Sequence, residues 1–226
     1  MTELGKMAAR LARVEDAVWD RYQLRKEPLE GRLTPEQRVR FSDLAHRTGI
    51  DLARRVRADH PGISVRELLS MYHVRLETPD APDQGVYHMF ASFTEPDLVT
   101  LYESTALEAQ QALTDTGALP GGTPLTEVLL AHELFHVLAY QTPLPTDEKL
   151  LELWKLGPLR VRSRVMVLSE MAAMVFAREL LKLPYSPNAL DVILLYPQDP
   201  PAARRIYESI VALEGSAPGA EGADAL

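Results

Sequence analysis

Residues 125–141 constrain the fold most, because most positions in this segment are apolar. Its sequence is LTEVLLAHELFHVLAYQ, and prolines at positions 143 and 145 end it. The pattern predicts a helix that packs into the core of the protein. The ionisable residues within it are Glu127, His132, Glu133 and His136. Burying two imidazoles and a carboxylate without partners is costly, so we expect these side chains to share a binding partner.

The composition excludes several kinds of site. With 226 residues, 46% hydrophobic and 25% charged, the chain has the make-up of one folded domain, with or without an appendage. It has no cysteine, which excludes disulfides, cysteine-ligated zinc, iron–sulfur clusters and cysteine nucleophiles. The 24 Lys and Arg against 32 Asp and Glu argue against a whole-domain nucleic-acid binder. The sequence shows neither a secretory signal nor a membrane-spanning run of about 20 apolar residues, so we expect a cytoplasmic protein.

His132-Glu133-Leu134-Phe135-His136 is an HExxH sequence on the predicted helix. Residues four apart lie on one face of a helix, so both imidazoles can bind one metal ion. Glu133 projects about 100° further around the helix, where it can reach a water on the ion rather than the ion itself. Zinc with an open coordination position lowers the pKa of its bound water to about 7, and the neighbouring carboxylate can accept the proton. The competing interpretation is a surface helix with His–Glu contacts.

A third ligand must come from elsewhere in the chain. A metzincin would have a histidine six residues after His136, but position 142 is Thr. The other histidines all lie upstream of the motif: His46, His60, His73 and His88. A carboxylate from a later helix is the remaining solution. Glu170 stands alone in the apolar run VMVLSEMAAMVFA of a predicted helix over residues 163–182, where a lone carboxylate is unusual.

Other roles for the acidic residues remain open. Glu170 could instead form a buried ion pair with an arginine such as Arg164. Glu148 and Glu152 are weaker ligand candidates, because they fall in a polar segment that we expect to be an exposed helix over residues 146–156. Glu127 lies about one turn before His132 and could support the site from outside the ligand shell. Ligand type alone does not exclude manganese or iron in place of zinc.

The HExxH motif is followed by E-x-x-A-x-x-F-A-x-x-L-L and then a proline, which resembles the ImmA/IrrE family of gluzincin-type metallopeptidases. The matching residues are Glu170, Ala173, Phe176, Ala177, Leu180, Leu181 and Pro184. The resemblance covers roughly residues 62–184. It implies an α+β, zincin-like fold in which a small antiparallel sheet packs on the HExxH helix.

The resemblance also implies the roles of individual residues. The ligands of one Zn²⁺ would be His132, His136 and Glu170, and the general base would be Glu133. The substrate would be a protein or peptide, such as a transcriptional repressor cut at one site. The chain departs from the family pattern in two places. Residues 143–160 lengthen the segment between His136 and Glu170, and Met174 stands where a thermolysin-type enzyme has an aspartate that orients a histidine.

The remaining patterns predict an N-terminal helical segment over residues 1–61, a zincin-like domain over 62–213 and a disordered tail over 214–226. Capping boxes at Thr34 and Ser64 begin helices, and Gly49 divides the first of them. The predicted helices cover residues 3–24, 35–48, 50–58, 65–71, 105–114, 146–156, 163–182 and 201–213. The predicted antiparallel sheet contains strands at residues 73–77, 86–93 and 98–103.

Two further expectations concern partners. A substrate strand could add to an exposed sheet edge, for which residues 98–104 are the candidate. An oxyanion could be stabilised by Tyr140, Tyr185, His88 or Tyr102, although each could equally be a packing residue.

Two functions other than hydrolysis remain as alternatives. Residues 32–58 faintly resemble a helix-turn-helix, with Ala45 and Gly49 at the spacing that the turn requires, although a solvated helical face is favoured over DNA binding. The other alternative is a catalytically inactive, zinc-binding regulatory protein.

Overall fold

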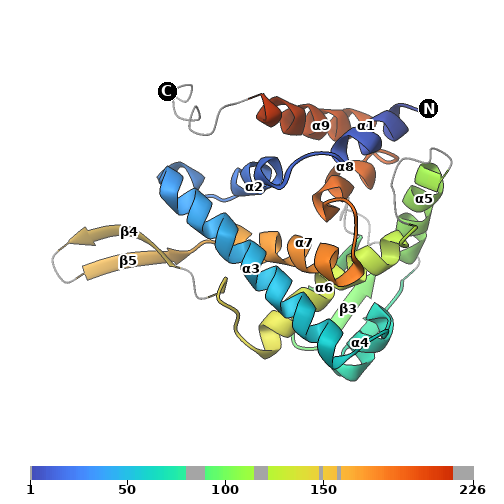
Figure 1. The fold of residues 1–226 in the computed structure, drawn as a ribbon, viewed down its shortest axis with the longest axis horizontal. Helices are drawn as coiled ribbons and strands as arrows, with labels where there is room; N and C mark the ends of the chain where they lie inside the picture. Colours follow the sequence, from blue (N-terminus) through green and yellow to red (C-terminus); the bar gives the residue numbers. More distant parts are fainter. Residues whose placement is uncertain (1, 80–89, 115–121, 148–149, 157–158, 216–226) are drawn as a thin grey trace.

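The computed structural model describes residues 2–79, 90–114, 122–147, 150–156 and 159–215, and it has an α+β fold that is mostly helical (Figure 1). Helix α6 (Leu125–Gln141) has the predicted bounds and lies at the centre of the fold. It packs against α7 (Val167–Leu181), where the rings of Phe135 and Phe176 lie 5.7 Å apart. Leu130, Leu134 and Leu168 are fully buried beside them. This pair of helices carries the residues of the predicted metal site.

Helix α3 (Pro35–Asp59) crosses α7 and is continuous, so the predicted division at Gly49 is wrong. The capping box at its start is confirmed: Gln37 N–H donates to Thr34 Oγ1, and Thr34 N–H donates to the Gln37 side chain. Gly49 lies where the backbone of α7 approaches most closely. The glycine therefore permits a helix crossing instead of ending a helix.

The main sheet has three strands: β1 (Arg75–Glu77), β2 (Ala91–Thr94) and β3 (Leu98–Leu101). Their order is β1-β3-β2, so β3 is central and its Val99 and Leu101 are completely buried. The three strands and the turn before β3 were predictable, but the purely antiparallel sheet is wrong, because β1 pairs parallel with β3. Residues 86–89 of the predicted second strand lie outside the described residues.

Residues 150–156 and 159–164 form two paired strands, so the helix predicted over 146–156 is wrong. Strands β4 (Leu150–Leu156) and β5 (Leu159–Arg164) pair antiparallel, with a register shift between Glu152 and Trp154. Pairing with residues that come later in the chain overrides the local preference of Leu, Glu and Lys for a helix. The hairpin projects away from the helical body (Figure 1).

The N-terminal segment contains two helices where one over residues 3–24 was predicted. Helix α1 (Glu3–Leu11) and helix α2 (Asp16–Leu24) are separated by a turn at residues 12–15. Short 3₁₀ helices cover Glu30–Arg32 and Pro187–Ala189. The remaining helices are α4 (Val65–Met71), α5 (Glu103–Thr114), α8 (Leu190–Ile193) and α9 (Pro200–Glu214). Within the described ranges, no helix combines the length and apolarity that crossing a membrane requires.

Two apolar clusters form the core, and the N-terminal segment contributes to both. The first gathers residues of α3, α4, α6, α7 and the sheet, including Phe41 and Leu52 of α3. The second joins α1, α2, α5, α8 and α9, with Trp19 of α2 nearly fully buried. Residues 1–61 therefore pack directly against the helices that carry the site. Most of the predicted disordered tail, residues 216–226, lies outside the described residues.

Candidate metal centre

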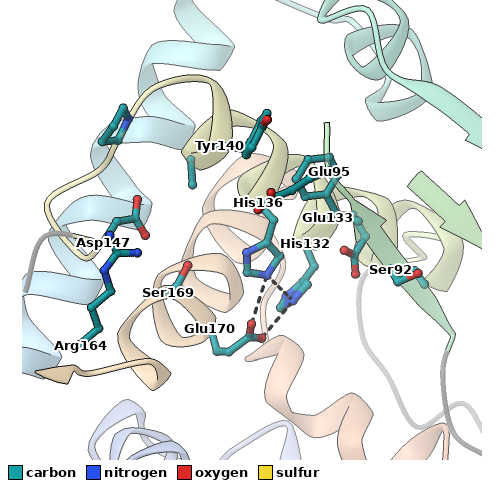
Figure 2. Close-up of a pocket in the computed structure, with 14 residues that line it drawn as sticks. Ser92, Glu95, His132, Glu133, His136, Tyr140, Asp147, Arg164, Ser169 and Glu170 are labelled. Atoms are coloured by element: carbon teal, nitrogen blue, oxygen red, sulfur yellow. Dashed lines mark hydrogen bonds and ion pairs between the residues drawn. The ribbon is translucent and has the colours of Figure 1, made fainter. Parts of the chain in front are cut away.

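The structure brings the three predicted ligand side chains together on α6 and α7 (Figure 2). The Nε2 atoms of His132 and His136 lie 3.1 Å apart. Glu170 Oε2 lies 3.3 Å from Nε2 of His132, and Glu170 Oε1 lies 3.4 Å from Nε2 of His136. Among the described residues, these are the ones whose ligand atoms converge as a metal site requires.

The spacing of these ligand atoms is compatible with one small divalent cation. Zinc binds imidazole nitrogen and carboxylate oxygen at about 2.0–2.2 Å, and a tetrahedron with such bonds has edges of about 3.3–3.6 Å. The two Nε2 atoms lie 3.1 Å apart, and each faces a different oxygen of Glu170, at 3.3 and 3.4 Å. With one ligand atom from each residue, all three atoms lie within 4.8 Å of one another. Two imidazoles and one carboxylate are also the donor set of several catalytic zinc sites. The residues present therefore fit a zinc ion.

The local sequence explains how each ligand is presented. His132 and His136 lie one turn apart on α6, and both imidazoles are largely buried. Glu170 lies in the first turn of α7 instead of mid-helix as predicted, and its side chain is 49% exposed. The neighbouring Ala172 and Ala173 are completely buried in the helix packing. Glu170 therefore reaches the imidazoles from the open side of the site.

Burial and the neighbouring charges shift the pKa of each of the three candidate ligands. Burial raises the pKa of Glu170, but the hydrogen bond from His132 and the nearby histidine charges outweigh it, so that the pKa falls to about 2. Burial lowers the pKa of His132, but the hydrogen bond to Glu170 and the charges of Glu133 and Glu170 raise it overall. Burial and the charge of His132 lower the pKa of His136 to about 4. The cluster thus keeps an ionised carboxylate and a neutral His136 at neutral pH.

Glu133 is held beside the cluster in a position suited to proton transfer. Its side chain is only 7% exposed, and burial raises its pKa, with the charge of Glu170 adding to the shift. The charge of His132 and the backbone N–H of Phe93 on β2 oppose this rise in pKa but do not outweigh it. Figure 2 shows this carboxylate on the β2 side of His132, away from Glu170. A carboxyl group with a raised pKa is a better general base near neutral pH than an exposed one.

A cleft of about 1030 Å³ opens over these residues. Its walls are β2, α6, the start of α7, and the segment that includes Asp147 and Arg164. Arg164 is exposed and lines the cleft, and none of its ion pairs within the described residues involves Glu170. The alternative in which Arg164 pairs with Glu170 is therefore wrong. The long segment between His136 and Glu170 contributes one wall of the cleft.

Among the described strands, the outer strand of the sheet at the cleft is β2, and the predicted edge at residues 98–104 is wrong. Strand β3 is central in the sheet and has a partner on each side, so it offers no edge. Strand β2 pairs only with β3 within the described strands, and its residues Ala91, Ser92 and Phe93 line the cleft. The sequence did not predict that Ala91, Ser92 and Phe93 line the cleft, because no local pattern indicates which strand of a sheet is outermost.

The oxyanion candidates separate clearly in the structure. Tyr140 lines the cleft, half exposed, with its ring 5.9 Å from that of Phe93. Tyr185 is buried in the second apolar cluster, and Tyr102 does not line the cleft. His88 lies outside the described residues. Among the described candidates, Tyr140 is therefore the one placed to stabilise an oxyanion, because it lines the cleft.

The outer partners of the ligands differ from expectation. Glu127 accepts a hydrogen bond from the backbone N–H of Val65 at 3.3 Å, so it caps α4. The buried Nδ1 atom of His132 makes no hydrogen bond to any described residue. Glu152 lies on the hairpin strand β4, and Glu148 lies outside the described residues. The sequence offers no aspartate at position 174, and the described residues supply no substitute for it.

Helix α3 does not have the geometry of a helix-turn-helix. It runs without a turn from Pro35 to Asp59, and both Ala45 and Gly49 are buried. Its exposed positions alternate in charge along one side, in the order Glu36, Arg40, Asp43, Arg47, Asp51 and Arg54. Such alternation is typical of a solvated helix face.

No family model, curated protein or solved structure significantly matches this chain. The function of this protein is therefore inferred from the chemistry and spacing of His132, Glu133, His136 and Glu170. The resemblance to the ImmA/IrrE family rests on the two motif blocks alone.

Proposed function

We propose that this protein is a zinc-dependent metallopeptidase with a zincin-like fold, similar to the ImmA/IrrE family. The observation that carries the proposal is the triangle formed by His132, His136 and Glu170 next to the buried carboxylate of Glu133. An open cleft gives a polypeptide access to both. A purely structural metal site would be closed by a fourth protein ligand, whereas the part of the chain that the structure describes supplies three ligand residues here.

Each residue has a defined role in this proposal. His132, His136 and Glu170 hold the zinc ion, which when bound activates water and polarises the scissile carbonyl. Glu133 accepts a proton from the attacking water and passes it to the leaving amine. The phenol O–H of Tyr140 donates a hydrogen bond to the developing oxyanion.

The substrate is an extended segment of a protein, which lies along β2 as an added strand. The edge of β2 that has no partner among the described strands offers backbone groups for this pairing, and the cleft has room for side chains on either side. By the same family resemblance, a transcriptional regulator is the candidate substrate. Other divalent ions with similar ligand preferences could replace zinc.

The decisive experiment compares zinc content and peptide cleavage in the same preparations. Wild type, Glu133→Gln and His132→Ala are purified without chelator and incubated with a peptide library made from a digested cell lysate. We expect one zinc per wild-type chain and cleavage detectable by mass spectrometry. Glu133→Gln keeps its zinc but loses at least about 100-fold in cleavage rate, because a general base contributes about 10²–10⁴. His132→Ala loses both.

A matched control is Glu127→Gln, the same change on the same helix but outside the cleft. It is expected to keep both zinc and cleavage. A wild type that binds zinc without cleaving any peptide points to the zinc-binding regulatory alternative. A wild type that holds no metal contradicts the proposed function altogether.

A further inference from the structure

Glu27 is a buried carboxylate that links the N-terminal segment to the start of α7. Its side chain is only 4% exposed, although it follows directly after α2. Oε1 of Glu27 accepts a hydrogen bond from the backbone N–H of Leu29 at 3.2 Å. Oε2 accepts one from the backbone N–H of Val167 at 3.1 Å, across 140 residues of sequence.

Helix α7 depends on this carboxylate because it has no cap of its own. The first N–H groups of any helix lack partners within the helix, and a polar side chain at the N-cap position usually satisfies one of them. The N-cap residue of α7 is Met166, which makes no such bond. A carboxylate at a helix N-terminus also interacts favourably with the helix dipole. The carboxylate of Glu27, which lies in another segment, accepts the hydrogen bond from Val167 N–H and so replaces the missing N-cap side chain of α7.

The capped turn is the same turn that carries a metal ligand. Val167 is the first residue of α7, and Glu170 follows three residues later on the same face of the helix. The ends of helices fray unless they are held. Fraying of this turn would move the Glu170 carboxylate away from His132 and His136, which it now approaches to 3.3 and 3.4 Å.

The residues around Glu27 hold it in place. Gln23 donates a hydrogen bond to Asn188, and both side chains are buried. Tyr22 donates to Asp191 at 2.8 Å, and Lys26 donates to the same carboxylate at 2.7 Å. The end of α2 is thus anchored beside α8 immediately before the chain reaches Glu27.

We propose that Glu27 is a positioning residue of the metal centre, which holds the first turn of α7 so that Glu170 meets the imidazole pair. This inference rests on the proposed function, since it requires a metal to bind at that cluster. Residues 1–61 are then part of the metal-binding unit, because a truncated chain that begins after residue 61 lacks Glu27, which caps α7.

The test measures zinc affinity by competition with a chromophoric chelator in the full-length chain. The variants are Glu27→Ala and Glu27→Gln, and the matched control is Asp199→Ala. Asp199 caps α9 by accepting from Ala202 N–H at 2.9 Å, and α9 carries none of the ligand residues. Thermal unfolding of the same samples separates a general loss of stability from a specific effect on the metal.

We expect Glu27→Ala to weaken zinc binding about 10–100-fold, the loss seen when outer partners of metal ligands are removed. Glu27→Gln keeps an oxygen acceptor for Val167 N–H, so it should restore most of that affinity. Asp199→Ala should lose stability but bind zinc as wild type does. The absorption spectrum of the cobalt-loaded protein should change in Glu27→Ala and stay unchanged in the control.

Three results would overturn the inference. Wild-type affinity in Glu27→Ala shows that α7 does not need this cap, and an equal loss in Asp199→Ala shows a general effect of stability. If Glu27→Ala does not fold, Glu27→Gln decides alone: affinity within about tenfold of wild type supports the inference, and a larger loss contradicts it. A wild type that binds no zinc refutes the proposed function itself, whereas the other results leave that function intact.

Discussion

The carbonyl oxygen of Ala172 lies only 2.5 Å from the position that a Cβ atom on Gly49 would occupy. The backbone nitrogen of Phe176 would lie 2.9 Å from the same atom, and the Cβ of Val175 would lie 3.0 Å away. Helices α3 and α7 therefore cross with their backbones in direct contact, and a hydrogen in place of a side chain makes this contact possible. Because α7 carries Glu170, the crossing also positions the helix that carries a proposed metal ligand.

Replacing Gly49 with alanine should destabilise the protein. The added methyl group meets backbone atoms of α7, which cannot turn away as a flexible side chain could. Overpacking of this kind costs about 1–3 kcal/mol, and we expect the upper part of that range for the free energy of unfolding. Urea denaturation followed by circular dichroism measures it. Gly31→Ala is the control, because nothing lies within 4 Å of a Cβ built there. Equal stability of the two variants would contradict the close crossing.

Replacing Glu170 with glutamine should weaken zinc binding more than any change next to it. Loss of an outer partner already reduces metal affinity by about 10–100-fold, so loss of a charged ligand should cost at least as much. Ser169→Ala is the control, since Ser169 also lines the cleft but lies outside the ligand triangle. Chelator competition measures both affinities. Similar affinities in the two variants would show that Glu170 does not coordinate the ion.

The proximity of His132, His136 and Glu170 is the feature of the protein that local sequence predicts best. Two histidines four residues apart must share a helix face, and this inference needs no knowledge of the tertiary fold. A lone carboxylate in an apolar helix also signals a polar partner, because its burial would otherwise be unfavourable. Glu170 has this pattern in the sequence, and the structure brings it to His132 and His136, although its side chain is 49% exposed at the start of α7. The sequence could not show that it lies in the first turn of α7, because that depends on where the preceding hairpin ends.

Strand pairing is the part that local sequence predicts worst. Residues 150–156 are rich in helix-forming types, and pairing with β5 makes them a strand. In the same way, nothing within residues 75–77 indicates that β1 lies parallel beside β3. Gly49 is misleading for a related reason, since the atoms that require a glycine belong to a helix more than 100 residues away. The hydrogen bond from Val167 to Glu27 likewise has no local signal.

The stability of the protein should fall as the pH rises through the pKa of His46. Nε2 of His46 donates to Asp20 at 2.8 Å, and this hydrogen bond raises the pKa of His46 although burial opposes the shift. A raised folded-state pKa gives a stabilisation that is complete below the unfolded value of 6.5 and is lost above it. The free energy of unfolding of the wild type should therefore exceed that of the His46→Gln variant, and the difference should be larger at pH 6 than at pH 9.

The partner of His46 supplies the control for this pH effect. In an Asp20→Asn background the imidazole has lost its hydrogen-bond acceptor, while burial and Arg178 still lower its pKa and Asp16 still raises it, so the larger effect of His46→Gln at pH 6 should disappear or reverse. Urea denaturation of the four variants at pH 6 and pH 9 completes the cycle. A pH-dependent difference that persists without Asp20 would assign the effect to other groups.

Arg164 should tune which peptides are cleaved without affecting the metal. It is the basic residue that lines the cleft within the described chain, among the acidic Glu95, Glu133, Asp147 and Glu170. Arg164→Ala should therefore lower the relative kcat/KM of library peptides that carry an acidic residue near the scissile bond. An exposed ion pair contributes about 0.2–1 kcal/mol, which corresponds to about a 1.4- to 5-fold change. Zinc affinity should stay at the wild-type value. An unchanged preference for acidic peptides, or an equal loss for neutral ones, would show that Arg164 does not contact the substrate.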